Sequence, residues 1–161
     1  DFGGSAFQWT SKMEDRNKLW QARHDAYYAA LALRPGCGGW ATDVCVPVSR
    51  LAECINETKA DLKNTSLQAP LVGHVGDGNF HLVYLVDTDN QDELDEAQAH
   101  SNRMVMRALA MGGTCTGEHG VGYGKMGFLQ AEHGDALALM RSLKMAFDPD
   151  NIMNPGKIVS L

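Results

Sequence analysis

The chain has 161 residues, the size of one ordinary domain, and is long enough to bury about two-thirds of its unfolded surface. A composition that is 44% hydrophobic and 21% charged is that of a folded protein and excludes a disordered or fibrous chain. The formal net charge of −6 argues against duplex nucleic acid as a partner, and no apolar run approaches the ~20 residues that a membrane-spanning helix needs.

The N-terminal part of the chain predicts a strand followed by an amphipathic helix. Residues 4–10 are expected to form a short strand, and Ser11 with Glu14 makes an S-x-x-E capping box that begins the helix. The helix is expected to end before Arg34. Its apolar stripe consists of Leu19, Trp20, Tyr27 and Leu31.

The middle of the chain predicts three strands and one helix. A strand over residues 41–46 stops at Pro47, and Ser49 is the expected N-cap of the helix that follows. Two more strands, over residues 70–74 and 80–86, flank a Gly-Asp-Gly turn signal. The helix carries apolar residues at helical spacing, namely Leu51, Cys54, Ile55, Thr58 and Leu62.

The last part of the chain predicts helices around a glycine-rich loop. Asn90 with Glu93 caps a long helix that ends at Gly112, and the glycine-rich loop follows over residues 112–124. Two shorter helical pieces and an irregular tail complete the chain. Because strands and helices do not alternate strictly, the sequence predicts an α+β fold, with a mostly antiparallel sheet and flanking helices in one domain over residues 1–161.

His74 and His81 lie seven residues apart, on either side of the Gly-Asp-Gly turn. On an unbroken strand their side chains would point to opposite faces, but a chain reversal can bring both imidazoles to one point. Glu118, in the glycine-rich loop, is the best candidate for a completing carboxylate. A His₂Glu set leaves coordination positions open, as catalytic metal sites do, and Zn²⁺, Mn²⁺, Fe²⁺ and Co²⁺ are all tolerable. From the residues alone, hydrogen-bonded turn histidines and a surface carboxylate are an equal alternative.

Two further residues are candidates for substrate chemistry. His119 follows Glu118 directly, so a metal held by Glu118 would lie beside an imidazole able to take the proton of a coordinated alcohol. Arg23 shares a helix face with Trp20 and Tyr27, where its guanidinium suits a substrate carboxylate. The alternatives are a buried histidine bonded to the backbone and an arginine whose stem covers apolar surface.

Five motifs occur in a fixed order along the chain. They are W-x-x-R (20–23), D-V-x-V-P (43–47), G-H-V-G-D-G-N-x-H (73–81), G-G-T-x-x-G-E-H-G (112–120) and F-D-P-x-x-I-M-N-P-G-K-I (147–158). The series resembles the C-terminal domain of FAD-linked oxidases of the vanillyl-alcohol oxidase type. The resemblance implies an α+β cap domain set against a flavin-binding domain that is absent from this chain. The chain is then a fragment, which we expect to be catalytically silent alone.

The resemblance also implies a role for each candidate residue. In similar enzymes the residues matching His74, His81 and Glu118 bind a divalent ion, for which Zn²⁺ or Mn²⁺ is expected here. The residue matching His119 lies by the flavin as the proposed base, and the arginine matching Arg23 holds the substrate carboxylate. Asn154 matches a position that contacts the FAD.

Within this family the motifs are most similar to those of enzymes that oxidise D-lactate in mitochondria and pass electrons to cytochrome c. Relatives that oxidise D-2-hydroxyglutarate tend to carry a lysine at the place of Ala41 and an asparagine at that of Val83. Two apolar residues here favour D-lactate or another small 2-hydroxy acid as the substrate. D-2-hydroxyglutarate or glycolate oxidation is the alternative within the family. A metallohydrolase and a non-catalytic metal-binding module are the alternatives of another class.

Overall fold

A computed structural model of the chain describes residues 9–161, and it has the expected α+β architecture. One strand lies at the centre of a four-stranded antiparallel sheet and pairs with each of the others. The central strand is β4 (Asn79–Val86), and its partners are β1 (Gly38–Ala41), β2 (Val44–Cys45) and β3 (Leu71–His74). The strand predicted over residues 4–10 lies outside the described residues, except for Trp9 and Thr10, which are not in a strand.

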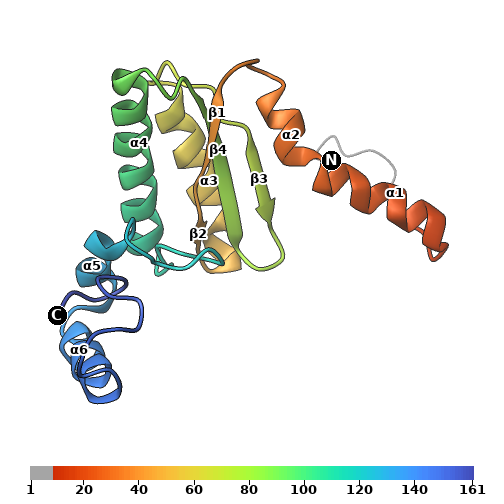
Figure 1. Cartoon of the computed structure of the whole chain (residues 1–161). Helices are drawn as coiled ribbons and strands as arrows, with labels where there is room; N and C mark the ends of the chain where they lie inside the picture. The colour runs from red at the N-terminus through yellow and green to blue at the C-terminus, as the bar shows by residue number, and fades with distance from the viewer. Residues whose placement is uncertain (1–8) are drawn as a thin grey trace.

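Helices cover the sheet and extend beyond it at both ends of the chain. Figure 1 shows α3 and α4 side by side against the sheet, with α1 pointing away from it and α5 and α6 beyond the end of α4. No helix within residues 9–161 is both long and apolar enough to cross a membrane. The helices are α1 (Met13–His24), α2 (Ala26–Leu31), α3 (Val48–Leu62), α4 (Gln91–Ala110), the 3₁₀ helix η1 (Met126–Phe128), α5 (Leu129–His133) and α6 (Ala136–Phe147).

Strand β4 is buried along its whole length because both faces of the sheet are covered there. Alternate residues from Phe80 to Val86 pack into the main core with residues of α3 and α4. On the opposite face, Val83 and Leu85 pack against Ala30 of α2. His81 shares this second face with Val83, so the sheet directs its imidazole away from the main core and toward α2.

Two expected helix starts are wrong, and in both cases the chain begins the helix without a side-chain cap. Helix α1 begins after Lys12 rather than Ser11, and the hydroxyl of Thr10 accepts the Lys12 N–H at 3.1 Å. Helix α3 begins after Pro47, whose carbonyl accepts the Arg50 N–H at 2.7 Å, so Ser49 lies inside the first turn. In contrast, the Asn90 side chain accepts the N–H groups of Asp92 and Glu93, which confirms the predicted cap of α4.

Two other predictions need correction where the chain bends. The single helix predicted to run up to Arg34 is interrupted at Asp25, between α1 and α2, and no residue of α1 is buried. The strand predicted over residues 41–46 is interrupted at Thr42 and Asp43. The Thr42 hydroxyl accepts the Leu82 N–H at 2.8 Å, so a bond to a side chain replaces one backbone hydrogen bond of the sheet.

A buried polar network joins β4 to the helix layer. Tyr84 and His100 are fully buried, and the Tyr84 hydroxyl lies 2.5 Å from His100 Nδ1. Burial raises the pKa of Tyr84, so the phenol stays protonated and its O–H group donates a hydrogen bond to this nitrogen. His100 Nε2 faces Asp61 Oδ2 at 3.7 Å, and the guanidinium groups of Arg103 and Arg107 hold that carboxylate.

We expect acidification to destabilise the protein through His100. Burial lowers the pKa of His100, although the nearby Asp61 acts in the opposite direction. A histidine whose folded-state pKa lies below its unfolded value gives its full contribution above about pH 6.5 and loses it as the pH falls below that value. The unfolding temperature of the full-length protein should fall less between about pH 7.5 and about pH 5.5 in His100→Gln than in wild type. An unchanged pH dependence in the variant would contradict this assignment.

Candidate metal and substrate site

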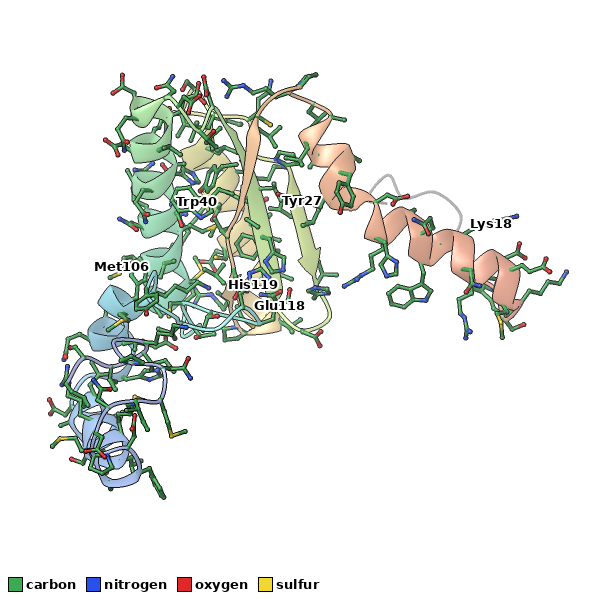
Figure 2. The ribbon with its side chains drawn as sticks, viewed as in Figure 1. Lys18, Tyr27, Trp40, Met106, Glu118 and His119 are labelled. Atoms are coloured by element: carbon green, nitrogen blue, oxygen red, sulfur yellow. The ribbon has the colours of Figure 1, made fainter. Side chains whose placement is uncertain are left out.

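Three residues that could bind a metal converge at one end of the sheet. His74 is the last residue of β3 and His81 the third of β4, so the turn between these strands brings their rings to a centroid distance of 5.8 Å. Glu118 reaches them from the glycine-rich loop, and the candidate ligand atoms of the three residues lie within 4.8 Å of one another. In Figure 2 the Glu118 and His119 side chains lie beside this end of the sheet.

A hydrogen bond to the backbone fixes the orientation of the His81 ring. His81 Nδ1 lies 2.7 Å from the carbonyl oxygen of Thr42. A carbonyl oxygen can only accept, so Nδ1 carries a proton, and in the neutral ring Nε2 then presents its lone pair. This nitrogen faces Glu118 Oε1 at 3.1 Å. Metal-bound histidines are usually held in this way, with the second nitrogen donating to a carbonyl or carboxylate.

The spacing of the three groups fits a divalent cation. Glu118 Oε1 lies 3.4 Å from His74 Nε2, in addition to its 3.1 Å approach to His81. Nitrogen and oxygen ligands bound at ~2.1 Å to one ion lie roughly 3.0–3.4 Å apart. An unprotonated nitrogen and a carboxylate oxygen at this distance repel each other unless a cation or a proton lies between them. Two imidazoles and a carboxylate at this spacing form a donor set that a divalent cation could use.

A second set of possible ligands, Asp43, His81 and His119, is less suitable. The carboxylate of Asp43 is 1% exposed and already accepts several hydrogen bonds, among them the backbone N–H groups of residues 117–119. Burial alone would raise the pKa of this carboxyl, but the N–H groups of His119 and Glu118 and the hydroxyl of Thr116 hold the pKa far below its usual range. Asp43 is thus an anion whose oxygens are occupied.

His119 lies at the edge of the cluster formed by His74, His81 and Glu118, and it is not one of these three candidate ligands. Its ring stacks on that of His81, with a centroid distance of 5.1 Å and an interplanar angle of 15°. Its Nε2 lies 3.5 Å from Glu118 Oε1, and the side chain is 48% exposed. A half-exposed imidazole beside a metal site can reach a bound molecule and exchange a proton with solvent.

Arg23 lies at the same place, although it comes from α1. Its Nη2 is 3.3 Å from His74 Nδ1, and its guanidinium lies over the Trp20 ring at 5.4 Å. Among the described residues, Arg23 has no carboxylate within ion-pairing distance, so its charge is available for an anionic ligand. A pocket of about 260 Å³ opens between Arg23 and the cluster, and its apolar walls include Ala26, Tyr27, Ala41, Val72 and Val83.

Asn154 is the one candidate that the structure does not place in this cluster. It is exposed, has a φ of 47° and lines a separate pocket with Lys157 and Ile158. The glycine-rich loop links the two places, because Glu118 and His119 line the first pocket and residues 120–122 line the second.

Asp43 and Lys125 are the residues of the site that reasoning from the sequence missed. Lys125 Nζ lies 3.1 Å from Asp43 Oδ2 and donates to it. The signal in the sequence was a single carboxylate, Asp43, directly before the apolar residues Val44, Cys45 and Val46 of a predicted strand.

Comparison with known proteins gives one family and a consistent set of relatives. Residues 1–158 match the family described as FAD linked oxidases, C-terminal domain. A probable mitochondrial D-lactate dehydrogenase of Danio rerio is 53% identical over 100% of this chain and 33% of its own length. The mitochondrial D-lactate dehydrogenase [cytochrome] of Arabidopsis thaliana is 45% identical over 97% of this chain and 28% of its own length. A glycolate oxidase subunit of Bacillus subtilis is 34% identical over 90% of this chain and 31% of its own length. The chain thus spans about a third of the length of these relatives.

Proposed function

Since the chain belongs to the family of FAD-linked oxidases, as their C-terminal domain, we propose that the protein is an FAD-dependent dehydrogenase of D-lactate or a related D-2-hydroxy acid. The observation that carries this proposal is the convergence of His74, His81 and Glu118 on a pocket that also contains Arg23, which has no carboxylate partner within residues 9–161. The FAD would be held mainly by a flavin-binding domain in the part of the protein outside these 161 residues.

The pocket supports a small monocarboxylate as the substrate. The guanidinium of Arg23 would hold the substrate carboxylate through two parallel hydrogen bonds, for which its planar fork is suited. Ala41 and Val83 line the pocket and offer no polar group to a second carboxylate. Leaving a second carboxylate unpaired against these side chains would be costly, so D-2-hydroxyglutarate should bind poorly.

The residues of the cluster divide the chemistry between them. A divalent ion held by His74, His81 and Glu118 would lower the pKa of the substrate hydroxyl. His119 accepts the hydroxyl proton at Nε2, the ring nitrogen that faces the cluster. When bound, FAD supplies the acceptor for the hydride that leaves C2. With the carboxylate held by Arg23 and the hydroxyl by the cluster, the position of the flavin would be the third point, so that only one enantiomer, proposed to be D, directs its C2 hydrogen at the acceptor.

The remaining parts of the proposal rest on the relatives. The names of both D-lactate dehydrogenases support a mitochondrial location, and that of the Arabidopsis thaliana relative supports a cytochrome as the electron acceptor, which we propose is cytochrome c. Asn154 would contact the flavin from the second pocket, at the far end of the glycine-rich loop. The glycolate oxidase subunit supports glycolate as the alternative substrate, because glycolate also carries one carboxylate and one hydroxyl.

Flavin reduction tests the proposed function directly. We expect anaerobic D-lactate to bleach the visible flavin absorbance of the full-length protein, and L-lactate or D-2-hydroxyglutarate to do so far more slowly. Reduction that is faster with glycolate than with D-lactate would favour the alternative. Full-length protein that retains its FAD but is reduced by neither compound would refute the proposed activity.

A further inference from the structure

One buried carboxylate ties the glycine-rich loop to the sheet. Asp43 Oδ2 accepts the N–H groups of Gly117 at 3.0 Å, Glu118 at 3.1 Å and His119 at 2.9 Å. The same oxygen accepts the hydroxyl of Thr116 at 2.9 Å and the ammonium of Lys125 at 3.1 Å, while Oδ1 accepts the amide of Asn79 at 2.8 Å. The carboxylate therefore joins the β1–β2 connection, strand β4 and the loop.

The backbone of the loop is arranged around this anion. Successive N–H groups that point to one centre form a nest, a concave arrangement that binds negative charge. Within the described residues, the N–H groups of residues 117–119 have no other acceptor, so without the anion this turn would lose its hydrogen bonds. The close approach requires glycine at residue 117, because a Cβ there would lie 2.0 Å from Asn79 Nδ2 and 2.9 Å from Asp43 Oδ1.

We propose that Asp43 is the positioning residue of the metal site, the group that holds Glu118 as a ligand and His119 as a base in their places. Two of the three N–H groups in the nest belong to these residues, so the anion fixes the Cα positions from which both side chains reach the cluster. The same residue borders the His81 ring, with Oδ1 3.9 Å from Nδ1. The inference rests on the proposed function, since it takes the cluster as the metal site.

Asparagine at this position separates charge from shape. Asp43→Asn keeps the volume of the side chain but replaces one carboxylate oxygen with an NH₂ group. This group is itself a donor, so it cannot accept the hydrogen bonds made at that position. It also leaves the Lys125 ammonium without its counter-ion. Asp61→Asn is the matched control, because Asp61 is also held by several charged donors, namely Arg103 and Arg107, but lies on α3 and touches no residue of the cluster.

The test measures affinity for Zn²⁺ and Mn²⁺, FAD content, unfolding temperature and amide hydrogen exchange in the full-length protein. We expect Asp43→Asn to bind metal 10–100-fold more weakly, the usual loss when a partner of the ligands is removed. Its amides at residues 117–119 should exchange faster, while FAD content stays at the wild-type level. Asp61→Asn should lose stability but keep wild-type metal affinity. If Asp43→Asn does not fold, Thr116→Val removes one donor to the same oxygen and should shift metal affinity in the same direction by less.

The outcomes separate the inference from the proposed function. Wild-type affinity in Asp43→Asn would overturn the inference and leave the metal site intact. A loss of metal matched by an equal loss of FAD and stability in both Asp43→Asn and Thr116→Val, as in a general folding defect, would also overturn it. A wild-type protein that binds neither metal, with loop amides still protected by Asp43, would instead refute the proposed metal site.

Discussion

Replacing His119 with alanine is expected to lower kcat for D-lactate oxidation by about 10²–10⁴-fold, the usual contribution of a positioned general base. The KM for D-lactate should change little, because Arg23 and the cluster, rather than His119, hold the substrate. An interaction that is used in the transition state and not in substrate binding affects kcat and kcat/KM alike. Single-turnover reduction of the flavin by D-lactate measures the step without interference from reoxidation.

Two measurements distinguish a base from a ligand at this position. The metal content of His119→Ala should equal that of wild type, because the first ligand set is complete without His119. His133→Ala is the matched control, since His133 is also partly exposed and next to a glutamate, Glu132, but lies on α5 outside the cluster. A His119→Ala variant that is reduced within about tenfold of the wild-type rate would exclude His119 as the base. Loss of the metal would show that His119 is a ligand.

The parts of the fold that follow from local patterns could be predicted from the sequence. Strands β3 and β4 and the turn between them follow from apolar residues on both sides of a Gly-Asp-Gly signal, and Gly78 does adopt a φ of 79°. Helix α4 begins where Asn90 predicts it and is followed by Gly112, which has a φ of 77°. In each case a side chain or a glycine acts within a few residues of its own position.

The failures of prediction occur where distant contacts decide the local structure. Residues 41–46 have the composition of one strand. However, the Thr42 side chain bonds to Leu82, and the Asp43 carboxylate bonds to the backbone of residues 117–119. Neither partner lies within 35 residues in the sequence. The break of the first helix at Asp25 has only a weak local signal, since histidine, aspartate and tyrosine, which occupy four of the residues 24–28, are among the poorer helix formers.

The same distinction explains what could be predicted of the site. His74, His81 and Glu118 stand out because histidines and a carboxylate among glycines are unusual, and the turn suggested how they could meet. The role of Asp43 could not be predicted, because its partners are mainly backbone N–H groups, which carry no residue type to recognise. The sequence therefore indicated the residues that we propose bind a metal, but not the residue that holds one of them, Glu118, in place together with His119.

Replacing either His81 or Glu118 with alanine is expected to remove the bound divalent ion. The hydrogen bond to the Thr42 carbonyl orients the His81 ring toward the site, so loss of this side chain leaves the ion with two of its three protein ligands. Elemental analysis should find about one equivalent of metal in the full-length wild type and little in both variants. D-Lactate turnover by each should fall to the level of wild-type protein treated with a chelator.

Re-addition of metal makes this expectation specific. Zn²⁺ or Mn²⁺ should restore turnover in chelator-treated wild type but not in His81→Ala or Glu118→Ala, because these variants lack one of three ligands. His100→Gln serves as the control for loss of a buried histidine, since His100 is fully buried in the helix layer and takes no part in the cluster. His81 and Glu118 lie on different elements and are held by different groups, the Thr42 carbonyl and the Asp43 nest. The two variants should nevertheless fail for the same reason, because each lacks one ligand of the ion. Wild-type metal content in either variant would mean that the convergence of these side chains serves some purpose other than binding an ion.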